Sequence, residues 1–168
     1  MAPAYFELLN PTQFESKHVM ISIGGMFTNK ISENWKKWFN SHWSDPVYAY
    51  KWSVKNELPS WKSFVPSIWS LLSLKSLLSK SFLAFKAITI PWDTRKTFLK
   101  MLKLAEQYGK LLAHLLILQF PFINQSISLV GFEVGAQVVY SCLEELQKLK
   151  VNNIIHNVYF IKGVVAAK

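Results

Sequence analysis

Three consecutive segments near the amino terminus constrain the fold more than any other feature. Residues 18–23 (HVMISI) form a short apolar run that ends at Gly24-Gly25, which predicts a buried strand entering a tight turn. Residues 29–43 follow with tryptophans and other apolar side chains at helical spacing, and residues 46–52 predict a second strand. A strand, a helix and a strand in this order favour a parallel sheet with a right-handed crossover.

The rest of the chain continues this alternation. A long helix capped at Asp93-Thr94 is predicted to run to about Leu118, and residues 127–130 predict the next strand. A second amphipathic helix is predicted from about 134 to 149, and a final strand within 154–165. We expect one α/β domain over residues 1–168, long enough to bury a substantial core.

Residues 58–91 differ from the rest in composition. The segment is strongly apolar, but lysines interrupt it, and the charge-free stretch 63–74 is too short to span a bilayer. An amphipathic helix on a membrane surface or under a partner fits this pattern, and packing of the insertion on its own domain has equal weight. The side chains expected to make membrane or partner contacts are Trp69, Leu71, Leu74, Leu78, Phe82, Lys75, Lys80 and Lys86.

Five residues between a predicted strand and a predicted helix carry the chemical signal. Gly131-Phe132-Glu133-Val134-Gly135 have the spacing of a nucleophile elbow, G-x-S-x-G, in which the middle residue occupies a sharp strand-to-helix turn. Glycines flank that residue because larger side chains would collide with the neighbouring strand and helix. In this sequence the middle residue is a glutamate.

The segment SISLVGFEVGAQVVYSCLEELQKLKVNNIIHNVYFI, residues 126–161, resembles the elbow region of the transmembrane-and-coiled-coil-domain family of α/β-hydrolase-like proteins. HVMISIGG, the tryptophan-rich segment and VYAYKW resemble the first conserved strand, helix and strand of this family, whose function is poorly known. The resemblance implies a truncated, three-layer α/β-hydrolase-like fold with a mostly parallel sheet and a hydrophobic helical insertion at 58–91. It also implies an oxyanion turn at Gly24-Gly25-Met26.

The catalytic residues that this resemblance requires are incomplete. The serine nucleophile falls on Glu133; aspartate serves at this elbow in some related folds, but the longer glutamate fits that geometry less well. The acid and the histidine of an α/β-hydrolase follow the nucleophile, whereas here only Glu144, Glu145 and His156 do. We expect a structural or surface role for His156, no catalytic residues, and an elbow and oxyanion turn that are vestigial.

Charge and composition limit the classes of partner. The formal net charge is +9, which suits an anionic membrane surface, an acidic protein or nucleic acid. Arg95 is the only arginine, which disfavours specific nucleic-acid recognition, since readout prefers the guanidinium fork. Cys142 is expected to be buried and inert, and neither a metal-ligand spacing nor a phosphate-binding loop occurs, so no cofactor is expected.

These observations favour a non-catalytic accessory subunit of a larger, membrane-associated assembly. Its binding partners would be other protein subunits and a membrane surface, and the expected location is intracellular, at a mitochondrial inner-membrane complex. The alternatives are half of a split hydrolase completed by another chain, and a peripheral lipid-binding module. Association with RNA is allowed by the charge but has no motif behind it.

Overall fold

The computed structural model describes residues 3–10, 16–25, 43–52, 92–163 and 165. The chain divides into two compact units, one made of Met1–Ser53 and Leu102–Lys168 and the other of Val54–Met101. The predicted insertion at 58–91, with its eight contact residues, lies outside the described residues, as do Met26 and most of the predicted helix at 29–43. The single-domain organisation therefore stays a prediction.

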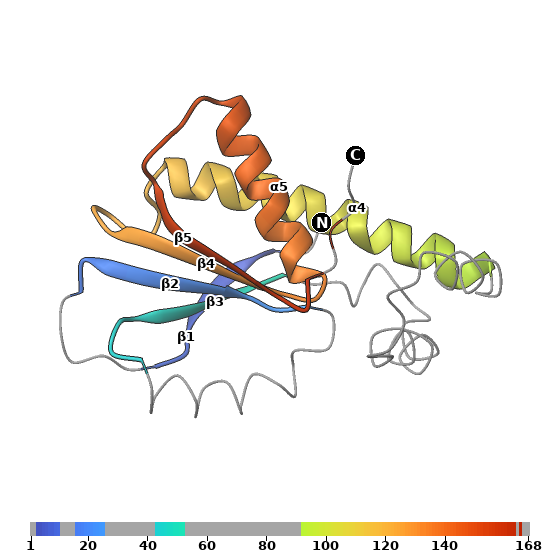
Figure 1. Cartoon of the computed structure of the whole chain (residues 1–168), viewed down its shortest axis with the longest axis horizontal. Helices are drawn as coiled ribbons and strands as arrows, with labels where there is room; N and C mark the ends of the chain where they lie inside the picture. Colours follow the sequence, from blue (N-terminus) through green and yellow to red (C-terminus); the bar gives the residue numbers. More distant parts are fainter. Residues whose placement is uncertain (1–2, 11–15, 26–42, 53–91, 164, 166–168) are drawn as a thin grey trace. The chain divides into compact units, whose positions relative to one another are not determined.

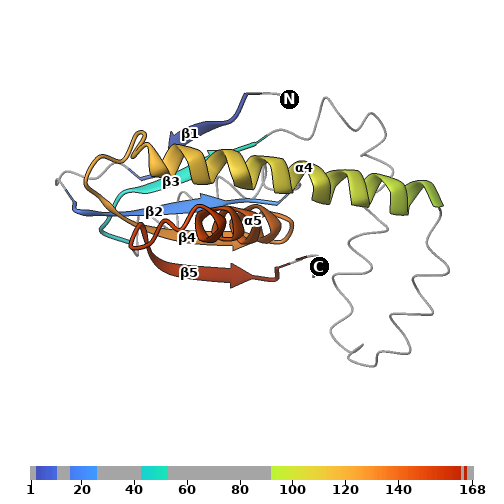
Figure 2. The same cartoon turned by 90° about the horizontal axis from the view of Figure 1, so that it is seen from above.

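The larger unit is built on a five-stranded sheet in the order β1-β3-β2-β4-β5. The strands are β1 (Tyr5–Leu8), β2 (His18–Ile23), β3 (Val47–Lys51), β4 (Ser126–Phe132) and β5 (Ile155–Ile161). Strand β1 runs antiparallel to β3, and the remaining neighbours pair in parallel. This arrangement, seen in Figures 1 and 2, confirms the predicted α/β class and the mostly parallel sheet, and adds the edge strand β1, which was not predicted.

The described helices are α4 (Trp92–Ile117) and α5 (Gly135–Lys148). Helix α5 and the part of α4 from Leu102 onward lie on one face of the sheet (Figure 1). The first and last residues of both helices agree with the predicted ones to within about two residues. The helices approach closely at Gly109, where an added Cβ would lie 2.7 Å from Cβ of Ser141 and would collide with the carbonyl oxygen of Val138. Only glycine therefore fits this crossing without movement of the helices.

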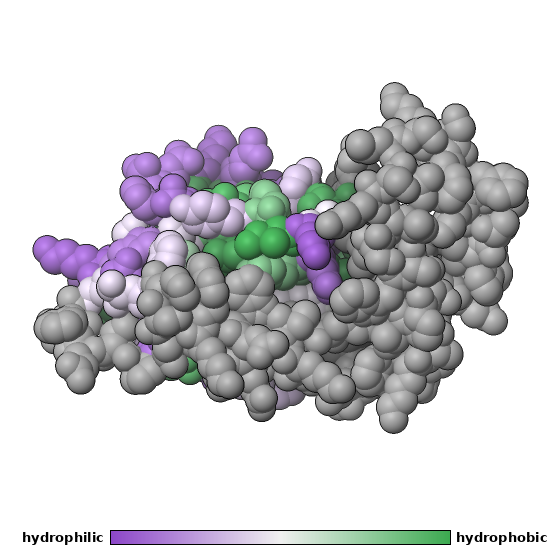
Figure 3. All heavy atoms as spheres, turned by 60° about the horizontal axis from the view of Figure 1, so that its bottom comes forward, coloured by the Kyte–Doolittle hydropathy of each residue, from purple (hydrophilic) through white to green (hydrophobic). Residues whose placement is uncertain are grey.

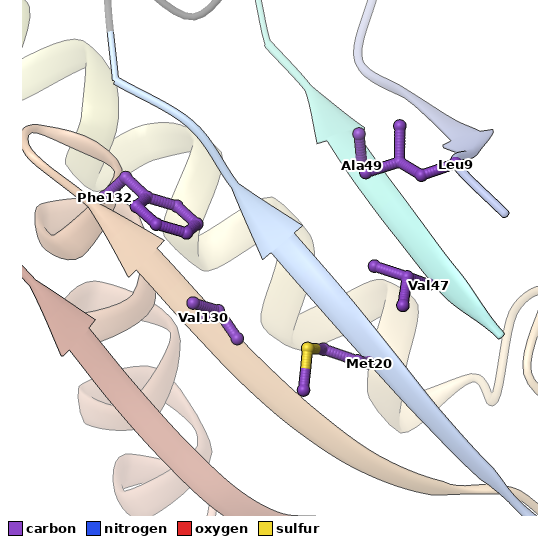
Figure 4. Close-up of a cluster of buried hydrophobic side chains, with 6 residues drawn as sticks. All are labelled: Leu9, Met20, Val47, Ala49, Val130 and Phe132. Atoms are coloured by element: carbon purple, nitrogen blue, oxygen red, sulfur yellow. The ribbon is translucent and has the colours of Figure 1, made fainter. Parts of the chain in front are cut away.

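The opposite face of the sheet carries its own apolar cluster. It consists of the buried side chains of Leu9, Met20, Val47, Ala49, Val130 and Phe132, which project from the sheet in Figure 4. Trp43 packs against this cluster. It was predicted to be the last residue of the helix at 29–43, but it is not helical. The remainder of the third layer in the predicted fold falls on 26–42, outside the described residues.

The parallel strands give the sheet two distinct ends. Ser126 of β4 pairs with His18 of β2, and Ile127 pairs with Ile155 of β5, so these three strands begin together. We call this the start end of the sheet. The other end, where β4 passes into α5, is the elbow end.

Candidate functional site at the strand-to-helix elbow

The turn between β4 and α5 has the backbone geometry of an elbow. Glu133 adopts a left-handed conformation with φ of 51°, which is uncommon for a side chain of this size. An added Cβ on Gly131 would lie 2.8 Å from Cα of Ala136, and one on Gly135 would collide with the carbonyl oxygen of Ile23. The predicted spacing therefore corresponds to a tight strand–turn–helix junction that requires both glycines.

The Glu133 side chain lies directly against the turn that follows β2. An added Cβ on Gly25 would be 2.6 Å from Oε2 of Glu133 and 2.8 Å from its Cβ. The Nε1–H group of Trp52, at the end of β3, donates a hydrogen bond of 2.9 Å to the carbonyl oxygen of Gly24 and so braces this turn. The two elements that the sequence predicted as elbow and oxyanion turn thus meet in space, and the glutamate carboxylate occupies the position between them.

Burial and a nearby lysine set the electrostatics of the elbow. Burial raises the pKa of the Glu133 carboxyl, and the positive charge of Lys162 opposes this rise. The backbone N–H group of Glu133 donates a hydrogen bond of 3.2 Å to the carbonyl oxygen of Ile161, the last residue of β5. Sequence reasoning missed Trp52, Ile161 and Lys162 at this site, because each comes from a segment remote from the elbow motif.

The described histidines lie away from the elbow. His18 begins β2 and His156 lies at the irregular start of β5, with their rings 5.9 Å apart, and His114 is in the last turn of α4. Ile161, beside the elbow, is five residue steps along the strand from His156, a distance of about 16 Å at roughly 3.3 Å per residue. Within the described ranges, no histidine is placed to act with Glu133.

Polar side chains at the start end form a separate hydrogen-bonded chain that the sequence did not predict. His18 contacts Oδ2 of Asp45 through Nδ1 at 3.1 Å and the hydroxyl of Ser128 through Nε2 at 2.8 Å. The hydroxyl of Ser16 donates to Oδ1 of Asp45 at 2.7 Å, and this bond is the main cause of the lowered pKa of Asp45. The order acid, histidine and serine is that of a hydrolytic triad, but Ser128 is only 1% exposed, in the middle of a sheet strand. These hydrogen bonds therefore hold β2 and β4 to the segment that leads into β3, and they do not present a nucleophile.

The described residues contain no group of acidic, histidine or cysteine side chains arranged to hold a metal ion. Cys142 lies on α5, is fully buried, and burial raises the pKa of its thiol to about 12. A thiol with such a pKa stays protonated and unreactive at neutral pH. The predicted inert role of this cysteine fits its surroundings.

The fold and the elbow define an α/β domain with a tight strand-to-helix junction that carries a carboxylate. The chain belongs to the family described as "Protein of unknown function (DUF726)", whose sequence profile matches residues 5–168. No solved structure matches the chain.

Two curated proteins are similar to parts of the chain. An "Uncharacterized membrane protein" of Schizosaccharomyces pombe is 39% identical over 78 residues, which cover 46% of this chain and 9% of that protein. A "Probable lipase MIL1" of Saccharomyces cerevisiae is 49% identical over 51 residues, which cover 30% of this chain and 5% of that protein. The chain thus spans less than a tenth of either relative. Within the described part of the chain, we find no helix with the length and apolarity needed to cross a bilayer.

Proposed function

We propose that this protein is a degenerate, non-catalytic α/β-hydrolase-like domain of the transmembrane-and-coiled-coil-domain type. We further propose that it acts as an accessory subunit of a larger membrane-associated assembly, with the mitochondrial inner membrane as its location. The observation that carries the proposal is Glu133, whose carboxylate lies against Gly25 where a hydrolase would hold its reacting carbonyl group. Because the carboxylate fills this space and position 133 is not a serine, a substrate carbonyl has neither a hydroxyl at the elbow to attack it nor room beside the turn.

The positions of the other ionisable groups support the absence of catalysis. Glu144 and Glu145 lie on α5, and the described histidines lie toward the start end. Among the described residues, therefore, no second carboxylate and no histidine faces the elbow in the arrangement that ester hydrolysis requires. Loss of the nucleophile alone costs about a million-fold in rate in a serine hydrolase. A hydrolase built on this chain would therefore need its nucleophile, acid and base from residues outside the described part of the chain or from another chain.

The outer strand β5 supports the role as a subunit. It is an edge strand whose side chains are open to solvent on both faces, with Tyr159 45%, Phe160 48% and Ile161 40% exposed. Figure 3 shows hydrophobic residues gathered on this side between hydrophilic ones. An open apolar strand edge is a template for pairing with another polypeptide segment. We propose that a partner segment covers it in the assembly.

Two measurements test this function. Gentle purification of the tagged native protein should yield a large assembly of fixed stoichiometry, measured by light scattering and mass spectrometry. Elution as a stable particle of about 19.4 kDa would contradict the accessory-subunit role. The purified chain and its Glu133→Ser variant should both fail to hydrolyse p-nitrophenyl butyrate above the buffer rate. Turnover by the serine variant alone would refute the absence of a catalytic acid and base, and would favour a split hydrolase or the lipase activity that the name of the S. cerevisiae relative suggests.

A further inference from the structure

The connection between α4 and β4 exposes three large apolar side chains close together. Leu118, Phe120 and Ile123 are 75%, 60% and 71% exposed, the three highest values among the large hydrophobic residues described. Single exposed apolar residues are common on soluble domains, whereas a concentrated group marks a contact surface. We call residues 118–123 the docking loop.

The docking loop is fixed to the sheet rather than hanging free. Phe122 is only 2% exposed, and its ring packs edge-on against the rings of Phe6 at 5.0 Å and Tyr48 at 4.9 Å. The side-chain amide of Gln125 donates a hydrogen bond of 2.9 Å to the carbonyl oxygen of Ser16. Because Phe122 anchors the loop, its exposed neighbours are held outward at little further cost in conformational entropy.

Exposed lysines lie at the same end of the sheet. Lys17 lies beside the first residue of β4, shortly after the docking loop, since its carbonyl oxygen accepts a 2.7 Å hydrogen bond from the N–H group of Ser126. Lys148 and Lys150 lie where α5 turns back into β5, at the start end (Figure 1); Lys148 is 3.9 Å from Glu145. No acidic residue occurs in residues 107–132 or 146–168. The acidic side chains described near this end are Asp45, which is hydrogen-bonded to Ser16 and His18, and Glu145 beside Lys148. The surface therefore combines protruding apolar side chains with positive charge.

We propose that the docking loop, together with Lys17, Lys148 and Lys150, binds the surface of an anionic lipid bilayer. Apolar side chains on a protruding loop can enter the boundary between headgroups and acyl chains, while the lysines meet lipid phosphate and carboxylate groups. Three side chains on one short loop offer too little area for a stable protein interface, which buries about 800 Å² on each partner. The proposal deepens the membrane association in the proposed function, but it depends on neither the elbow nor β5.

The test is co-sedimentation of the whole chain with vesicles of phosphatidylcholine alone and of phosphatidylcholine with about 30% phosphatidylserine, an anionic lipid. We expect binding to the anionic vesicles that weakens with salt. The double variant Leu118→Ser with Ile123→Ser should bind roughly tenfold or more weakly, since each large apolar side chain contributes about tenfold when it leaves water. The double variant Lys148→Gln with Lys150→Gln should bind more weakly to anionic vesicles at low salt.

The matched control is Tyr5→Ser with Leu111→Ser, which removes two exposed apolar side chains, 59% and 39% exposed, outside the docking loop. This control should bind vesicles as the unchanged protein does. Equal binding by all variants would overturn the proposal, because other parts of the chain would then contact the lipid. Failure of the unchanged protein to bind anionic vesicles would also overturn it. Either result would leave the non-catalytic subunit role intact, because that role is tested by assembly size and ester turnover.

Discussion

The conformation of Glu133 makes a prediction that separates backbone strain from the loss of its charge. A non-glycine residue in the left-handed region costs about 1–2 kcal/mol, because its Cβ approaches the following carbonyl oxygen. Glycine avoids this strain, but its greater freedom in the unfolded chain costs roughly 0.5–1 kcal/mol. The Glu133→Gly variant should therefore be more stable than Glu133→Ala by about 0.5–1 kcal/mol in the free energy of unfolding. Both variants lack the carboxylate, so effects of its burial and of Lys162 cancel from the difference.

The assay is urea unfolding of the two variants, followed by circular dichroism, with thermal unfolding as a second measurement. For a chain of this size the glycine variant should melt about 2–4 °C higher for each kcal/mol, and its urea midpoint should rise by a few tenths molar. A result in which the alanine variant equals or exceeds the glycine variant would refute the reasoning. It would mean that residue 133 does not adopt the left-handed turn that makes this junction an elbow.

Three further changes probe the elbow, the helix crossing and the polar chain at the start end. Burial raises the pKa of Glu133 in the folded protein, so its carboxyl group ionises at a lower pH in the unfolded chain, and the free energy of unfolding falls as pH rises above about 4.5. Glu133→Gln should therefore be more stable than the unchanged protein at pH 7, and the difference between their urea midpoints should close below about pH 4. Gly109→Val should lower the free energy of unfolding, measured in urea, by about 1–3 kcal/mol, because the valine side chain would force α4 away from α5. Leu111→Ala, at a partly exposed position on the same helix, should cost less than about 1 kcal/mol. Equal costs would refute the close crossing. Asp45→Ala should cost about 1–2 kcal/mol at pH 7 through its lost hydrogen bonds. Because its pKa is lowered from 3.8, that cost should be present above pH 3.8 and shrink as pH falls below it, and a pH-independent cost would argue against an ionised Asp45.

Local patterns predicted the elements of this fold well where one face or both are buried. The run at 18–23 coincides with β2, because a strand buried on both faces is written as a continuous apolar segment. The final strand was predicted within 154–165, and β5 spans Ile155–Ile161; it ends where Lys162 turns into the left-handed region with φ of 49°. Strand β1 was not predicted, because four residues paired antiparallel to β3 at a sheet edge carry no periodic signal of their own.

The candidate site was predictable only in part, for a reason of sequence distance. The glycine spacing around Glu133 identified the elbow, since tight packing against a neighbouring strand demands small residues at fixed positions. The contact between Glu133 and Gly25 joins residues far apart along the chain, and the resemblance to a family, rather than any local pattern, suggested that they meet. The bond between His18 and Ser128 spans 110 positions, and no feature of either segment predicts the other.

The hydrogen bond from Glu133 to Ile161 ties the elbow to the outermost strand. Successive residues of a strand direct their backbone groups to opposite sides. Since the carbonyl group of Ile161 faces inward, those of Phe160 and Val158 face the free side of β5. A segment that pairs with this side would therefore steady the peptide on which the elbow rests, and amide exchange at Glu133 should slow when it binds. The turn at Glu133 would then report whether a partner segment is paired with β5.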